Sequence, residues 1–150
     1  MSCILGIDPG ASTGCAIYRA GKLAHLETIA PEDIADYISQ VAPARVIFED
    51  SRLQSKVWTP VKGDAALKVA RNIGEIDAWC RLITAVCARL GIPAHGISPK
   101  GKGAKTSAEQ FAAATGWTGW TGKSNEHTRD GAMVAYPYRG AGHRVQRSAA

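Results

Sequence analysis

The sequence lacks the features of a membrane-spanning or secreted protein. No run of about eighteen consecutive apolar residues occurs, which excludes a membrane-spanning helix of ordinary length. The first ten residues, MSCILGIDPG, have no basic residue before their apolar run and reach an aspartate by position 8, so they do not form a secretory signal peptide. The four cysteines include no CxxC pair, which argues against a zinc ribbon or a thioredoxin-like site.

The cysteines also do not fit a disulfide scaffold. Cys80 and Cys87 lie seven residues apart on one expected helix, which separates their Cα atoms by roughly 10 Å. A disulfide needs Cα atoms within about 7 Å of each other. We therefore expect Cys3, Cys15, Cys80 and Cys87 to be buried thiols in a reducing compartment, the cytoplasm.

What is present is typical of one globular domain. The chain has 150 residues, of which 45% are hydrophobic and 21% are charged. Lys and Arg number 18 against 13 Asp and Glu, for a net charge of +5, which permits a polyanionic partner without requiring one. No internal repeat or shift in composition marks a boundary, so we expect one domain over residues 1–138. The Gly-, Arg-, Ser- and Ala-rich tail 139–150 is expected to be disordered.

The order of apolar runs and turn residues predicts an α/β fold. Strands are expected at 3–8, 14–19, 22–29, 45–49 and 94–98. Helices are expected to begin at Pro31, at Asp64, at Thr106 or Ser107, and at Ser124 or Asn125, and to be stopped by Pro43, Gly91, Gly116 and Pro137. The first three strands form an antiparallel meander and helices separate the others, which predicts a mixed sheet flanked by helices.

The second expected helix is long and amphipathic. Asp64 is expected to cap it. One apolar face is expected from residues spaced by three and four, namely Ile73, Ile76, Trp79, Ile83, Val86 and Leu90.

Two carboxylates end strands that could be neighbours in the sheet. Asp8 ends the first expected strand and Glu49 ends the fourth, at the kind of sheet edge where ligands commonly bind. Asp50 follows Glu49, and adjacent strand residues point to opposite faces. Only one of the two can face Asp8, and we choose Glu49. The alternative is that these acids are ordinary strand-end residues in turns.

The last expected helix begins with further polar side chains. His127 and Asp130 lie three residues apart and Glu126 and Asp130 four apart, so each pair shares one helix face. Gly131 follows and would let the helix approach the sheet closely. Acids are also favoured near any helix N-terminus, so this cluster alone is better explained by a solvated helix start.

Taken together, Asp8, Glu49, Asp130 and either His127 or Glu126 form an oxygen-rich set. Such ligands suit Mg²⁺ or Mn²⁺, and clustered carboxylates repel one another unless a cation neutralises them. Two such ions about 4 Å apart can activate a water and stabilise the leaving oxygen of a phosphodiester.

The segments ILGIDPGASTGCAIY, VIFED and HTRDGAMVAY, in this order, resemble the RuvC family of Holliday junction resolvases, within the RNase H-like superfamily. DAALKVARNIGEIDAWC is similar to that family's long central helix, and the compact length resembles phage-encoded members. The resemblance implies an RNase H-like fold, a homodimer, a bacterial or phage-infected host cell, and metal-dependent nicking of branched DNA by Asp8, Glu49, His127 and Asp130. Many relatives have Asp where His127 stands, so Mn²⁺ is expected to serve as well as Mg²⁺ or better.

Basic and aromatic residues are expected to rim this site. Trp58 could stack on an unpaired base, worth about 1–3 kcal/mol, or could instead belong to the core or an interface. Phosphate contacts are expected to make binding weaken steeply with salt. The expected DNA-binding residues are Arg52, Lys56, Trp58, Lys100, Lys102, Lys105 and Lys123.

Three other functions remain open. A YqgF-like nuclease would share the fold and the first motif and act on structured RNA. A non-catalytic module would bind junctions through a decayed metal site, with His127 as the sign of decay. An actin-like ATPase also opens with a Gly-Ile-Asp-x-Gly strand, but 150 residues are too few for two lobes, and no second phosphate loop occurs.

Overall fold

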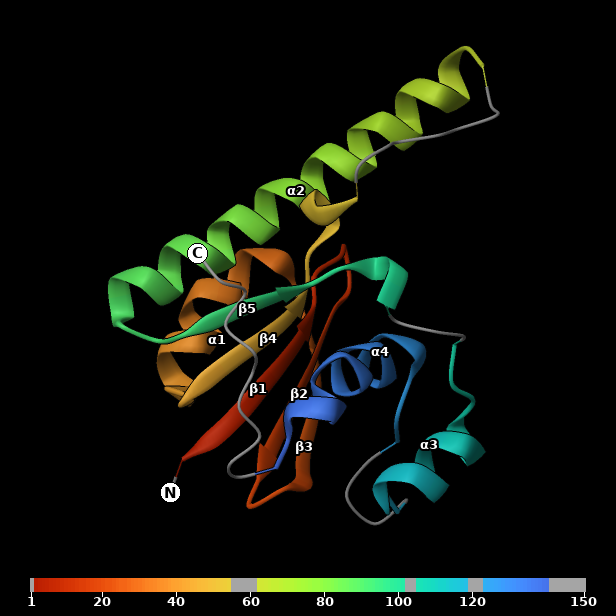
Figure 1. The fold of residues 1–150 in the computed structure, drawn as a ribbon. Helices are drawn as coiled ribbons and strands as arrows, with labels where there is room; N and C mark the ends of the chain where they lie inside the picture. Colours follow the sequence, from red (N-terminus) through yellow and green to blue (C-terminus); the bar gives the residue numbers. More distant parts are fainter. Residues whose placement is uncertain (1, 55–61, 102–104, 119–122, 141–150) are drawn as a thin grey trace.

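A five-stranded mixed sheet forms the centre of the protein (Figure 1). The structure is a computed structural model that describes residues 2–54, 62–101, 105–118 and 123–140. The strand order is β3-β2-β1-β4-β5. The strands are β1 (Cys3–Asp8), β2 (Thr13–Arg19), β3 (Lys22–Ile29), β4 (Arg45–Glu49) and β5 (Ala94–Ile97).

The pairing confirms the expected mixed sheet. β1, β2 and β3 form an antiparallel meander, whereas β4 runs parallel to both β1 and β5. β4 is central and its apolar run is buried on both faces: Val46 and Phe48 join one core cluster and Ile47 joins the other. This explains why its sequence shows no alternation of apolar and polar residues.

Helices cover the two faces of the sheet unequally (Figure 1). α1 and α2 pack on one face, and α4 lies across the other, with α3 beyond it. The bounds are α1 Ile34–Val41, α2 Asp64–Leu90, α3 Ala108–Thr115 and α4 Glu126–Ala135. Within the described ranges, no helix is both long enough and apolar enough to cross a bilayer.

Helix ends differ from expectation where proline is involved. Pro31 opens a short 3₁₀ turn, Pro31–Asp33, and the α-helix begins only at Ile34. α4 ends at Ala135 rather than Tyr136, and Pro137 lies inside a second 3₁₀ turn, Tyr136–Tyr138. Proline lacks an N–H and fits the first turn of a helical segment, so it reshapes these ends instead of simply stopping them.

Two expectations about α2 were wrong. Asp64 was expected to cap the helix, but Gly63, with φ 74°, holds the N-cap position and Asp64 is the first helical residue. Leu90 is 45% exposed, because it lies in the last turn before the chain leaves the helix at Gly91. Cys80 and Cys87 are buried on the packed face instead.

The cysteines are buried thiols, as expected from the sequence. All four cysteines are free and buried. Burial raises the pKa of the Cys15 thiol well above its ordinary value, and it raises the pKa of Cys87 to about 11. These thiols therefore act as small apolar core residues.

Candidate active site

Asp8 and Glu49 lie side by side at one edge of the sheet. Ile7 pairs with Phe48 in the parallel β1–β4 ladder, so the next residue of each strand occupies the neighbouring position. Strand alternation puts Asp8 on the face of Gly6, and Glu49 on that of Ile47, which packs in the α4-side core. The two carboxylates also line one cavity of about 210 Å³, whose other walls include Pro9, Ser51 and Pro99.

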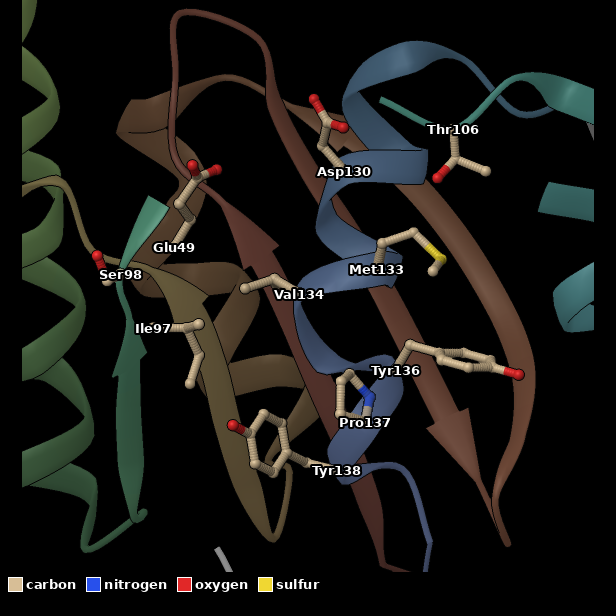
Figure 2. Close-up of a pocket in the computed structure, with 10 residues that line it drawn as sticks. All are labelled: Glu49, Ile97, Ser98, Thr106, Asp130, Met133, Val134, Tyr136, Pro137 and Tyr138. Carbon is tan, nitrogen blue, oxygen red and sulfur yellow. The ribbon is translucent and has the colours of Figure 1, made fainter. Parts of the chain in front are cut away.

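Asp130 reaches the same edge from α4. A second cavity, of about 220 Å³, is lined by both Glu49 and Asp130 (Figure 2). Figure 2 shows the two carboxylates at one end of this cavity, with Ile97, Val134 and Tyr138 along its length. Glu49 thus lines both cavities and connects Asp8 on β1 with Asp130 on α4.

Three glycines allow α4 to lie this close to the sheet. A Cβ atom on Gly14 of β2 would overlap the carbonyl group of His127, and one on Gly6 of β1 would overlap the carbonyl oxygen of Gly131. In the other direction, a Cβ on Gly131 would overlap the carbonyl oxygen of Gly14. The close approach expected from Gly131 is therefore confirmed, and it sets the height of Asp130 above β1 and β2.

The turn after Asp8 is fixed by a side chain that the sequence analysis missed. Thr13 is completely buried. Its hydroxyl donates a hydrogen bond of 2.8 Å to the carbonyl oxygen of Gly10 and accepts one of 3.3 Å from the Gly10 amide. The spacing Gly-x-x-Thr after the aspartate was the available signal, since a Thr hydroxyl can close a turn onto backbone three residues away.

Asp50 faces away from Asp8, as strand alternation predicts, and has a different partner. Its side chain packs over Gly96 of β5 and forms a two-point ion pair with Arg52, with both N–O distances 2.8 Å. Burial raises the pKa of the Asp50 carboxyl, but hydrogen bonds from Arg52 outweigh this and hold the pKa below its ordinary value. Arg52 also donates to the Thr84 hydroxyl, so its guanidinium links η2 (Ser51–Leu53) to α2.

His127 is placed less directly than the three carboxylates. It is half-exposed in the first turn of α4 and lines neither of the two cavities. Its Nε2 lies 3.7 Å from Oε1 of Glu126, whose Oε2 lies 3.8 Å from Nζ of Lys105. The roles of His127 and Glu126 at the site stay predictions.

The expected DNA contacts fall into three groups. Lys100, Lys105 and Lys123 are exposed on the segments around β5 and α4. The Arg52 guanidinium is bound to Asp50, as described. The other expected DNA contacts, Lys56, Trp58 and Lys102, lie outside the described residues, as does the tail beyond residue 140.

The donor chemistry at the sheet edge fits a hard divalent cation, because carboxylate oxygens are the ligands that Mg²⁺ and Mn²⁺ prefer. Their arrangement is not a closed ligand set: in the part of the chain that the structure describes, no three His, Cys, Asp or Glu side chains gather closely enough to hold a metal ion. Metal binding by Asp8, Glu49 and Asp130 therefore stays a prediction.

Comparison of the whole structure decides which fold this is. The structure of Thermus thermophilus RuvC in complex with a Holliday junction substrate superposes with a TM-score of 0.61 at 15% identity, covering 91% of each chain. The chain has the RuvC fold. A second Thermus thermophilus RuvC structure matches with a TM-score of 0.53 at 17% identity, covering 89% of this chain and 91% of that one. No protein-family model matches the chain, and no curated protein does. The RuvC fold confirms the expected RNase H-like mixed sheet.

Proposed function

We propose that this protein is a metal-dependent endonuclease that nicks Holliday junctions or other branched DNA. One observation carries the proposal: Glu49, at the end of β4, lines both the cavity that holds Asp8 and the cavity that holds Asp130. Three carboxylates from distant parts of the sequence therefore line two cavities that share Glu49. The similarity of the fold to RuvC bound to a Holliday junction supports the choice of substrate.

In this proposal Asp8, Glu49 and Asp130, with His127, hold one or two Mg²⁺ or Mn²⁺ ions. When bound, the ions neutralise the carboxylates, activate water and stabilise the charge that develops on a phosphodiester. The protein's own contribution is orientation. β1 and β4 hold two carboxylates at neighbouring positions of one sheet, and the glycine contacts fix the third above them.

The chain's basic residues would hold the DNA backbone around this acidic edge. Lys100, Lys105 and Lys123 are exposed near the segments that carry Ser98, Thr106 and Asp130. Because each phosphate contact releases counterions, binding should weaken steeply as salt rises. Resolving a four-way junction takes two matched nicks, which a C2 homodimer would supply.

The test is cleavage of a synthetic four-way junction beside a linear duplex of the same sequence. We expect the wild-type protein to nick the junction in Mg²⁺ or Mn²⁺ and not in EDTA. Asp8→Asn and Asp130→Asn should each lower the rate by about 10²-fold or more, as expected when a group that stabilises developing charge is lost. Asp36→Asn, an exposed acid on α1 at the opposite face, is the matched control.

The outcomes separate the alternatives. Cleavage by Asp130→Asn at the rate of Asp36→Asn would overturn the proposal. Junction binding without nicking in any divalent metal would support a non-catalytic module instead. Faster cleavage of structured RNA than of the junction would support a YqgF-like nuclease.

A further inference from the structure

Arg129 connects two segments that the sequence separates by the whole of α3. Its Nε donates a hydrogen bond of 3.0 Å to the carbonyl oxygen of Thr106, and its Nη1 donates one of 3.2 Å to the Ser124 hydroxyl. Thr106 lies just before α3 and Ser124 just before α4. One guanidinium therefore holds both ends of the 106–124 segment against α4.

Both ends carry exposed lysines. Lys105 precedes Thr106 and Lys123 precedes Ser124, and both lysines are exposed. Thr106 also lines the cavity that Glu49 and Asp130 line, as Figure 2 shows. Fixing the backbone of Thr106 and the side chain of Ser124 thus fixes where two positive charges emerge beside the acidic edge.

The start of α4 itself is held independently of Arg129. Asn125 and Thr128 form reciprocal capping hydrogen bonds of 2.9 Å each, and the Asn125 side chain donates to the Thr28 hydroxyl on β3. The three-glycine contact with β1 and β2 holds the next turn. Arg129 is therefore not needed to place Asp130, and its two hydrogen bonds act on the neighbouring segments.

An arginine suits this task for a geometric reason. Its planar guanidinium presents several N–H groups in fixed directions and can serve two acceptors on different segments at once. A lysine keeps the charge but presents a single ammonium on a flexible stem. Arg129→Lys is consequently a charge-preserving way to remove the link.

We propose that Arg129 is a positioning residue for nucleic-acid binding, which holds the segments carrying Lys105 and Lys123 beside the carboxylates of the candidate active site. This inference rests on the proposed function, because it assumes that the two lysines contact a polyanionic substrate. Arg129 acts through these lysines and does not itself contact the reacting phosphate.

The experiment measures junction binding in EDTA over a range of salt concentrations, for wild type, Arg129→Lys and the control Arg89→Lys. Arg89 is exposed near the end of α2, away from this site. We expect Arg129→Lys to bind the junction about tenfold more weakly than wild type. Its plot of log affinity against log salt concentration should also be shallower, by about one unit of slope for each lysine displaced. Arg89→Lys should leave affinity and slope unchanged.

A double-mutant cycle separates positioning from simple loss of structure. Replacing Lys105 and Lys123 by alanine should weaken binding in the wild-type background and have a clearly smaller effect in the Arg129→Lys background. Equal losses in both backgrounds, or an Arg129→Lys slope equal to that of Arg89→Lys, would overturn the role of Arg129 alone. A wild-type protein that binds no junction and no other nucleic acid would overturn the proposed function and this inference together.

Discussion

The contact between α4 and the sheet can be tested with two glycine substitutions that differ only in their surroundings. Gly131 and Gly74 both lie inside α-helices, in α4 and α2. A Cβ on Gly131 would overlap the Gly14 carbonyl oxygen and lie 2.8 Å from its carbonyl carbon, whereas a Cβ on Gly74 would meet no atom within 4 Å. The comparison of Gly131→Ala with Gly74→Ala thus isolates this contact.

The expected magnitudes follow from two effects. Alanine is favoured over glycine inside a helix by about 1 kcal/mol, so Gly74→Ala should raise the free energy of unfolding by about that amount. Gly131→Ala gains the same propensity but must push α4 away from backbone atoms of β2, and overpacking of this kind costs about 1–3 kcal/mol. Gly131→Ala should therefore be less stable than Gly74→Ala by about 1–3 kcal/mol.

The assay is urea unfolding followed by circular dichroism, with the midpoints compared at equal slope. If Gly131→Ala were as stable as Gly74→Ala, α4 would not lie on β2 as described. The same displacement would move Asp130 relative to Glu49, and a misplacement near 1 Å can cost about 10²-fold in rate. Junction cleavage by Gly131→Ala should accordingly be slower than that by Gly74→Ala, by about 10²-fold.

Two further predictions concern the ends of β1 and β4. Thr13→Val should leave the Gly10 carbonyl without its hydrogen bond and lower the free energy of unfolding by about 1–2 kcal/mol, whereas Thr13→Ser should keep most of it; urea midpoints of the two variants check this. Asp50→Asn should cost about 1–3 kcal/mol at pH 7, because it breaks the pairing of a buried carboxylate with Arg52. Since the folded pKa of Asp50 is lowered, this stability is present above the unfolded value of about 3.9 and is lost as the pH falls through the folded pKa. The difference in free energy of unfolding between wild type and Asp50→Asn should thus become smaller below about pH 4. A difference of constant size down to about pH 2, measured by urea unfolding, would contradict the ion pair.

The sequence was most informative where one local rule decides the structure. The strand 45–49 was predicted with its observed bounds, because an apolar run between two turns is short and unambiguous. Ser107, with Gln110 three residues later, forms the capping box that its spacing predicts. Strand alternation predicted that only one of Glu49 and Asp50 could face Asp8, and the choice of Glu49 agrees with the observed pairing of β1 with β4.

Contacts that depend on the third dimension could not be predicted. Arg52 was expected to bind phosphate, and nothing in the sequence shows that Asp50 and Thr84 take up its donors. No pattern in the sequence singles out Arg129, because its two partners lie five and twenty-three residues away along the chain. The contact of Arg52 with Thr84 and the two contacts of Arg129 join residues whose spacing follows no helical or strand period.

Glu49 and Asp50 show why these two kinds of information belong together. They are adjacent acids at the end of one central strand, and alternation sends them to opposite faces of the sheet. On its own face, Asp50 is fixed by Arg52, and its amide donates to the carbonyl oxygen of Ile97, which ties the end of β4 to β5. Next to Asp50, the Ser51 hydroxyl donates a hydrogen bond to the Asp77 carboxylate on α2. The backbone that carries Glu49 is therefore held through Asp50 and Ser51, which tie the end of β4 to β5 and to α2. Of these two adjacent acids, Asp50 thus fixes the end of the strand and Glu49 lines both cavities.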